Sequence, residues 1–130
     1  MIGVDMSFVT DDEVRADRLF TSFSIFTAEL LDSFAALGLQ RRFCLMVYPW
    51  QEKLVRVRFP GFSVCVVSWK PSQWLDTLTR GRVRCRSLIR RLNRHAVAVK
   101  KHGIRCVWFP YAMPDRFFAP GVPYVPQSTI

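Results

Sequence analysis

Short apolar runs that begin or end at proline or glycine alternate along this chain with longer segments of helical periodicity. This alternation constrains the fold more than any other feature of the sequence. A continuous run of apolar residues is typical of a strand that is buried on both faces of a parallel sheet. We predict five such strands, at residues 2–9, 42–48, 62–69, 104–109 and 122–125.

The segments between the strands predict helices of different lengths. Residues 19–37 carry an apolar side chain at every third or fourth position, and Gly38 follows where a helix C-terminus is expected. Residues 51–58 predict one or two helical turns, and a long helix is predicted to end near His102 and Gly103. Residues 10–18 are polar, and we predict a loop there.

Strand and helix alternation of this kind predicts an α/β fold, a Rossmann-like parallel sheet of about five strands with flanking helices. The length of 130 residues and a hydrophobic fraction of 50% suit one domain over residues 1–130. Ligands of such sheets bind beyond the carboxyl ends of the strands. The residues expected at that edge are 7–10, 48–50, 69–71 and 109–115.

The positive charge of the chain belongs to one segment. The net charge is +9, and ten cations lie between Arg80 and Arg105 with no acid among them. When this segment is placed on a helical wheel, one arc of the wheel is apolar and the remainder is basic. The apolar arc holds Cys85, Leu88, Ile89, Leu92, Ala96 and Val99. The basic remainder holds Arg84, Arg86, Arg90, Arg91, Arg94 and Lys101.

Three interpretations of this basic face stay open. It is an ordinary solvated helix face, a contact for an anionic membrane surface, or a contact for nucleic acid. Nucleic acid is the least favoured partner, because the sequence has neither a helix-turn-helix nor an aromatic nucleic-acid signature.

The four cysteines indicate buried, reduced thiols. They stand about twenty residues apart without a C-x-x-C pair, so we predict no metal site and no disulfide framework. No secretory signal and no apolar stretch of membrane-spanning length occur in the sequence. These features favour the cytoplasm, with peripheral contact to the inner face of the membrane as an extension of the basic-face hypothesis.

Common catalytic and nucleotide-binding motifs are missing from the sequence. It has no G-x-G-x-x-G motif, no P-loop and no G-x-S-x-G elbow, so no cofactor is predicted for this chain. His95 and His102 have no partner in sequence, which favours surface or capping roles. Asp5 ends an apolar run and is predicted to have a buried polar role. We predict no catalytic residue.

Four segments of the chain resemble parts of one known domain. Residues 102–111, HGIRCVWFPY, resemble its passage from a helix end through a strand to an F-P-Y motif. Residues 122–125, VPYV, resemble its strand that leads to a His-Asp pair, and residues 2–5, IGVD, resemble its first strand. Residues 26–37 resemble its first helix. The domain that these segments resemble is the N-terminal domain of group 1 glycosyltransferases of the GT-B fold.

The resemblance implies an acceptor-side domain for sugar transfer from a nucleotide sugar. The loop after the F-P-Y strand lines the acceptor side in that family, and aromatic rings suit a sugar or lipid-linked acceptor. The expected acceptor-binding residues are Phe109, Tyr111, Met113 and Ser7. The alternative is that Phe109 and Tyr111 only fill space at the edge of the sheet.

The sequence also departs from the family. Residues 18–24 contain no glycine where the family has a glycine-rich turn, and residues 126–128 differ from the strand that leads to the His-Asp pair. The donor-binding domain does not follow, so we expect a truncated, inactive acceptor half, with a nucleotide sugar bound only with a second domain. Self-association through an exposed edge strand or the missing-domain surface is expected as well. The alternative function is a non-enzymatic basic module that binds an anionic membrane or nucleic acid through the 80–105 helix.

Overall fold

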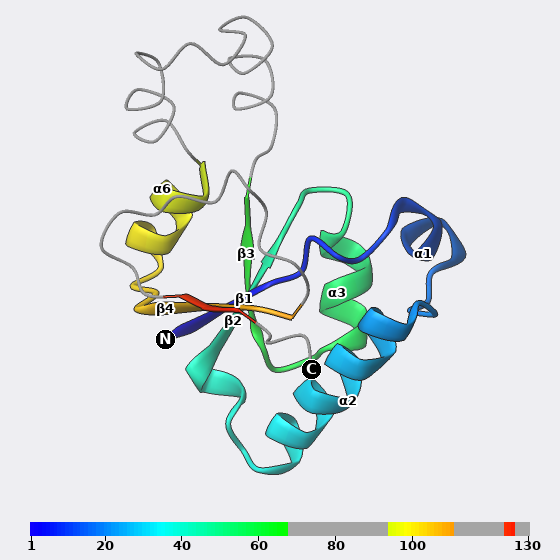
Figure 1. Ribbon diagram of the computed structural model, residues 1–130, viewed down its shortest axis with the longest axis horizontal. Coiled ribbons are helices and arrows are strands. Elements are labelled where there is room, and N and C mark those ends of the chain that lie inside the picture. The colour runs from blue at the N-terminus through cyan, green and yellow to red at the C-terminus, as the bar shows by residue number, and fades with distance from the viewer. Residues whose placement is uncertain (68–93, 111–123, 127–130) are drawn as a thin grey trace, which may run out of the picture.

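The computed structural model describes residues 1–67, 94–110 and 124–126, which form a parallel sheet flanked by helices (Figure 1). Every strand pair in the sheet is parallel. The strands are β1 (Ile2–Asp5), β2 (Phe43–Val47), β3 (Ser63–Val66), β4 (Cys106–Phe109) and the three-residue β5 (Tyr124–Pro126). The helices are α1 (Asp11–Ala16), α2 (Ser22–Ala36), α3 (Glu52–Arg58), α6 (Arg94–Lys101) and a 3-10 turn at Gln40–Arg42. The predicted α/β class with a parallel sheet is confirmed.

The strands lie in the order β3-β2-β1-β4-β5. The chain therefore builds outward from β1 in one direction through β2 and β3, and then returns to the other side of β1 for β4. This reversal places a topological switch point between β1 and β4, and ligands of open parallel sheets bind near such a point, beyond the carboxyl ends of the strands.

One face of the sheet packs against α2 and α3. Alternate side chains of β1 and β2 point to this face, because successive strand residues point to opposite sides. Phe34 of α2 stacks on Phe43 at the start of β2, with 4.8 Å between ring centroids. The buried members of this cluster are Val4, Met6, Val9, Ala28, Leu31, Phe43, Leu45, Val47, Leu54, Val55, Phe59 and Phe62.

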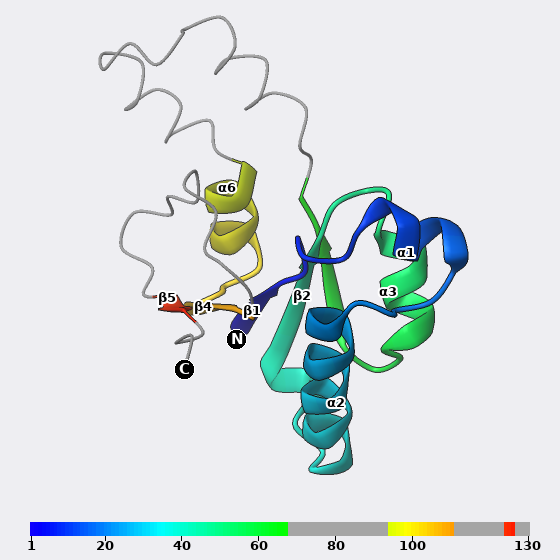
Figure 2. The same cartoon turned by 45° about the vertical axis from the view of Figure 1, so that its right-hand side comes forward.

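The opposite face packs against α6, and the two views in Figures 1 and 2 place this helix across the sheet from α2 and α3. The buried cluster on this face has fewer large aromatic side chains than the first cluster and includes two thiols. The buried members of this second cluster are Cys44, Met46, Cys65, Val67, Ala98, Val99, Ile104, Val107 and Phe109. Both clusters use the central strands, so the sheet forms the middle layer of the domain.

Two glycines end helices by the same hydrogen-bonding motif. After α2, Gly38 has a φ of 71° and Leu39 N–H donates to the Phe34 carbonyl at 2.9 Å. After α6, Gly103 has a φ of 62° and Ile104 N–H donates to the Val99 carbonyl at 2.9 Å. A left-handed residue at this position satisfies the last helical carbonyls, and glycine adopts it without a side-chain clash. Both predicted helix ends are confirmed.

The predicted loop at residues 10–18 is wrong, because α1 occupies Asp11–Ala16. The Thr10 and Glu13 side chains form a capping box, in which each side chain bonds the backbone N–H of the other residue. The first four predicted strands are also longer than the observed β1 to β4, whereas β5 runs one residue beyond the predicted end at 125. None of the helices in the described part of the chain is both long and apolar enough to cross a lipid bilayer.

Candidate functional site

An open pocket of about 690 Å³ lies at the carboxyl ends of β1 and β2. Among the described residues, three segments line it: the turn after β1, helix α1 and the turn after β2. The lining residues are Ser7, Asp11, Val14, Arg15, Tyr48 and Trp50. The volume is in the range of small-molecule sites, and the place is where parallel sheets bind ligands.

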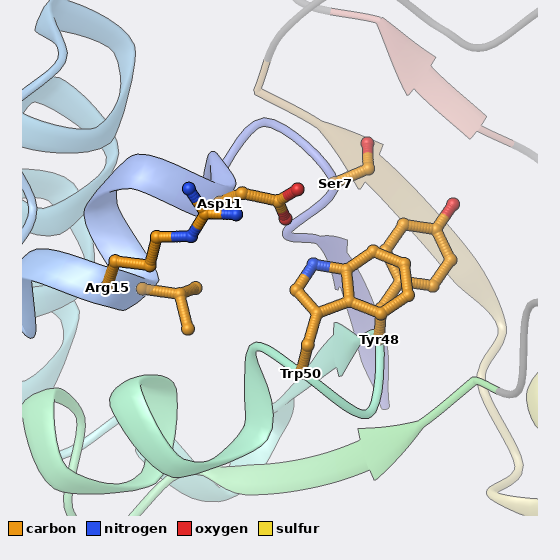
Figure 3. Close-up of a pocket in the computed structure, with 6 residues that line it drawn as sticks. Ser7, Asp11, Arg15, Tyr48 and Trp50 are labelled. Atoms are coloured by element: carbon orange, nitrogen blue, oxygen red, sulfur yellow. The ribbon is translucent and has the colours of Figure 1, made fainter.

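Two stacked aromatic rings form one wall of the pocket. The ring centroids of Tyr48 and Trp50 are 4.7 Å apart and their planes differ by 18°. Trp50 is 41% exposed, so the stacked pair keeps an accessible apolar surface. Figure 3 shows the two rings side by side, with Asp11 and Arg15 extending toward the same space from α1. Burial, together with the negative charge of Asp5, raises the pKa of Tyr48 to about 12 and keeps its phenol neutral.

A buried carboxyl group stands behind the polar side of the pocket. Asp5, the last residue of β1, is 4% exposed and accepts a short hydrogen bond from the Ser7 hydroxyl. Burial raises the pKa of Asp5 to about 6, although the bonds from Ser7 act in the opposite direction. While Asp5 is ionised, the hydroxyl proton of Ser7 points inward, and its oxygen can accept a hydrogen bond from a ligand. The predicted buried polar role of Asp5 is confirmed.

A second buried carboxylate holds α1 beside the pocket. Glu13 is fully buried and accepts four hydrogen bonds of 2.8 to 3.0 Å. Burial alone would raise the pKa of Glu13, but these donors outweigh it and lower the pKa below its ordinary value. The donors are the backbone N–H groups of Thr10, Phe20 and Thr21 and the hydroxyl of Ser24. Glu13 thereby ties the start of α1 to the start of α2.

A buried amide joins the two turns that carry Ser7 and the aromatic pair. Gln51 is 1% exposed, and its side-chain oxygen accepts the Tyr48 N–H at 2.9 Å. Its side-chain nitrogen donates to the carbonyls of Met6 at 3.1 Å and Val9 at 2.8 Å. The bond to Tyr48 closes the turn after β2, and the two bonds to Met6 and Val9 hold this turn against the turn after β1.

The acceptor-binding residues predicted from the sequence are distributed as follows. Ser7 lines the pocket. Phe109 is fully buried in the cluster beneath α6, so its ring packs in the core and is not among the pocket residues. Tyr111 and Met113 lie outside the described residues.

Most of the predicted basic face also lies outside the described residues. This holds for Arg84, Arg86, Arg90 and Arg91. Arg94 is the first residue of α6, and Lys101 is its last residue and is exposed. Contact of this face with a membrane or nucleic acid, and location in the cytoplasm, stay predictions.

Sequence analysis missed the contribution of α1 and of Gln51. Asp11, Val14 and Arg15 belong to the segment that we predict as a loop, although the T-x-x-E pattern of Thr10 and Glu13 is a helix-start signal. Nothing in the sequence marks Gln51 as buried. The stretch 48–50 was expected at the ligand-binding edge, and Tyr48 and Trp50 do line the pocket.

Comparison of the chain with protein-family models, with curated proteins and with solved structures finds no match in any of the three.

Proposed function

We propose that this chain is the acceptor-binding domain of a glycosyltransferase of the GT-B type, and that its pocket holds a sugar of the acceptor. The observation that carries the proposal is the stacked Tyr48 and Trp50 pair facing polar side chains at the carboxyl edge of the sheet. The parallel sheet and its strand order are compatible with a Rossmann-like half of such an enzyme.

The lining of the pocket matches the two kinds of surface that a sugar presents. The C–H face of a pyranose packs on an aromatic ring, and the accessible ring surface of Trp50 offers such a platform. The sugar hydroxyls need both donors and acceptors. The Ser7 oxygen and the Asp11 carboxylate can accept hydrogen bonds, and the Arg15 guanidinium can donate them.

Arg15 also bears on the class of acceptor. A guanidinium group binds phosphate or carboxylate oxygens through two parallel hydrogen bonds. Asp11 lines the same pocket, and its carboxylate repels a ligand that carries only negative charge. A sugar with one anionic substituent, such as a sugar phosphate or a uronic acid, satisfies both residues if its hydroxyls face Asp11.

Sugar transfer in a GT-B enzyme takes place in a cleft between an acceptor domain and a donor domain. The described residues form one domain, and the proposal assigns it the acceptor side. We therefore expect the 130-residue chain to bind an acceptor sugar and to leave a nucleotide sugar unconsumed unless a donor domain is supplied.

Calorimetric titration with neutral sugars, sugar phosphates and uronic acids tests the proposal. We expect at least one sugar to bind, and Trp50→Ala to weaken that binding by roughly tenfold, since loss of an aromatic contact of this kind removes about 1 to 1.5 kcal/mol. Phe26→Ala is the matched control, because Phe26 is a similarly exposed aromatic residue on α2 and is not among the pocket residues. Sugar binding that Trp50→Ala leaves unchanged, or no binding across the panel, would contradict the proposal.

A further inference from the structure

We propose that Cys44, Cys65 and His102 form a zinc site between the sheet and the end of α6. The two sulfur atoms and one imidazole nitrogen all lie within 4.8 Å of one another. Both thiols are buried and free, whereas His102 is exposed. This site lies on the α6 face of the sheet and shares no residue with the pocket lined by Ser7 and Trp50.

Strand pairing brings the two cysteines together. Cys65 of β3 pairs with Met46 of β2, and Cys44 lies two residues before Met46 on the same strand. Residues two apart on a strand point to the same face, so both thiols face α6, and both belong to its buried cluster. The ligands are far apart in sequence, and only the parallel pairing of β2 with β3 makes them neighbours.

The end of α6 places the histidine over this thiol pair. His102 follows the last residue of α6, and the hydrogen bonds around Gly103 fix the turn at this point. Ile104 then packs against the sheet at Gly3, where an added Cβ would lie 3.0 Å from the Ile104 Cγ2 atom. Gly3 is the register partner of Cys44. The absence of a side chain at Gly3 thus lets the turn after α6 approach the strand that carries Cys44.

The ligand set and the spacing suit zinc. Zinc prefers four tetrahedral ligands drawn from thiolate and imidazole, and its bond lengths imply about 3.8 Å between two sulfurs and about 3.6 Å between sulfur and nitrogen. The observed atoms need to approach by at most about 1.2 Å to reach these separations. Three protein ligands leave one position for water, and the exposure of His102 gives that position access to solvent.

A disulfide between the two cysteines fits this geometry less well. Neighbouring strands are about 4.8 Å apart, and two residues along a strand span about 6.6 Å, which places the two Cα atoms about 8 Å apart. A disulfide requires a Cα separation below about 7 Å. Two thiolates that bind one zinc ion lie about 3.8 Å apart, a wider sulfur separation than the bond of a disulfide requires.

The charges of zinc and of its three protein ligands balance at this site. Binding of one Zn²⁺ forms two Zn–S bonds and one Zn–N bond and releases two thiol protons to solvent. The resulting unit of Zn²⁺ with two thiolates and a neutral imidazole carries no net charge, which suits a site at the edge of a core.

Titration of the reduced chain with Co²⁺, followed by displacement with Zn²⁺, tests the site. We expect one equivalent of Co²⁺ to produce the thiolate-to-cobalt charge-transfer absorption of a tetrahedral site, and Zn²⁺ to abolish it. Cys44→Ser and Cys65→Ser are expected to remove most of this absorption. His102→Ala is expected to weaken Zn²⁺ binding by at least tenfold, and because His102 is exposed this variant should fold normally.

Cys106→Ser is the matched control. Its neighbours Val107 and Phe109 belong to the cluster beneath α6, so the alternation along β4 places Cys106 on the opposite face. Zn²⁺ should raise the Tm of the unmodified chain and of Cys106→Ser by similar amounts, and should raise the Tm of His102→Ala by less. The proposal is overturned if no thiolate absorption appears, or if His102→Ala and Cys106→Ser bind Zn²⁺ equally.

Discussion

Asp5 and Glu13 are both buried carboxyl groups close to the pocket, yet their pKa values shift in opposite directions. Burial raises the pKa of Asp5 to about 6, and Ser7 supplies the hydrogen bonds that oppose the increase. Burial acts on Glu13 in the same direction, but three backbone N–H groups and the Ser24 hydroxyl lower its pKa. The number of donors, and not burial alone, decides which carboxyl group stays charged.

This difference separates a fixed part of the pocket from an adjustable part. Glu13 remains an anion that joins α1 to α2, so the wall that carries Asp11 and Arg15 keeps its position. Asp5 gains or loses a proton near pH 6, and this changes the direction in which the Ser7 hydroxyl can donate. We expect the pH dependence of ligand binding to originate at Asp5.

The largest expected effect comes from Glu13→Ala. The substitution leaves buried N–H groups without their charged acceptor, and we expect it to lower the free energy of unfolding by about 3 to 5 kcal/mol. Urea denaturation at pH 7 measures this loss. Asp12→Ala, an exposed acid in the same helix turn, should lower the free energy by less than about 1 kcal/mol. Equal losses in the two variants would show that Glu13 is not the joint between α1 and α2.

Asp5→Asn should shift the free energy of unfolding at pH 8 in the opposite direction from Glu13→Ala. Because the folded-state pKa of about 6 lies above the ordinary 3.8, Asp5 contributes most to stability below pH 3.8 and loses that contribution as the pH rises through 6. The loss amounts to about 3 kcal/mol at pH 8, since one pKa unit corresponds to about 1.4 kcal/mol. Asparagine does not titrate, so the variant does not undergo this loss. The free energy of unfolding of Asp5→Asn, minus that of the unmodified chain, should therefore be larger at pH 8 than at pH 3.5.

Urea denaturation of both proteins at the two pH values checks this prediction. Ser7→Ala is the companion variant, because it removes the hydroxyl bond that lowers the pKa of Asp5 and should enlarge the loss of stability at pH 8. A difference between Asp5→Asn and the unmodified chain that is the same at pH 3.5 and pH 8 would contradict a raised pKa.

Gln51→Met tests a buried polar group that carries no charge. Methionine has a similar volume but cannot donate to the Met6 and Val9 carbonyls, and we expect a loss of about 2 kcal/mol together with weaker sugar binding. Gln40→Met is the control, because Gln40 is only half-buried and makes one bond, to the Ala35 carbonyl. Thermal unfolding should show a larger decrease in Tm for Gln51→Met than for Gln40→Met. An equal or smaller decrease for Gln51→Met would show that Gln51 does not hold the two turns together.

Asp32→Ala should have the smallest effect. The Asp32 carboxylate pairs with both terminal nitrogens of Arg58, but both side chains are exposed. The Arg58 hydrogen bond lowers the pKa of Asp32, yet exposed pairs contribute at most about 1 kcal/mol. We expect a change below that value at low salt and a smaller one at high salt. A loss as large as that of Glu13→Ala would break the distinction between buried and exposed carboxylates.

Sequence patterns predicted the layered fold well, because buried parallel strands and amphipathic helices leave direct marks in the sequence. The proline after Tyr48 and the glycines at 38 and 103 marked ends that the structure confirms. Helix α1 was not predicted, because its six residues are mostly polar and show no apolar periodicity. Its stability comes from the buried Glu13, whose donors lie up to eleven residues away and become neighbours only on folding.

The candidate sites were less predictable for the same reason. The edge that carries Tyr48 and Trp50 follows from strand order, but the bonds of Gln51 that hold this edge join residues more than forty positions apart. The thiols of Cys44 and Cys65 show no local metal motif. They meet because β2 and β3 pair in one particular register, which the sequence alone does not specify.

The central claim is that the pocket at the carboxyl ends of β1 and β2 binds a sugar. Nuclear magnetic resonance of the ¹⁵N-labelled chain, titrated with the saccharide panel, tests it most directly. We predict that the sugar changes the chemical shifts of the Trp50 indole N–H and of the backbone amides of Ser7, Asp11 and Arg15. The amide signals of Cys44, Cys65 and His102 should keep their chemical shifts. Shifts that gather on the α6 face, or a Trp50 indole signal unmoved by every sugar, would contradict the claim.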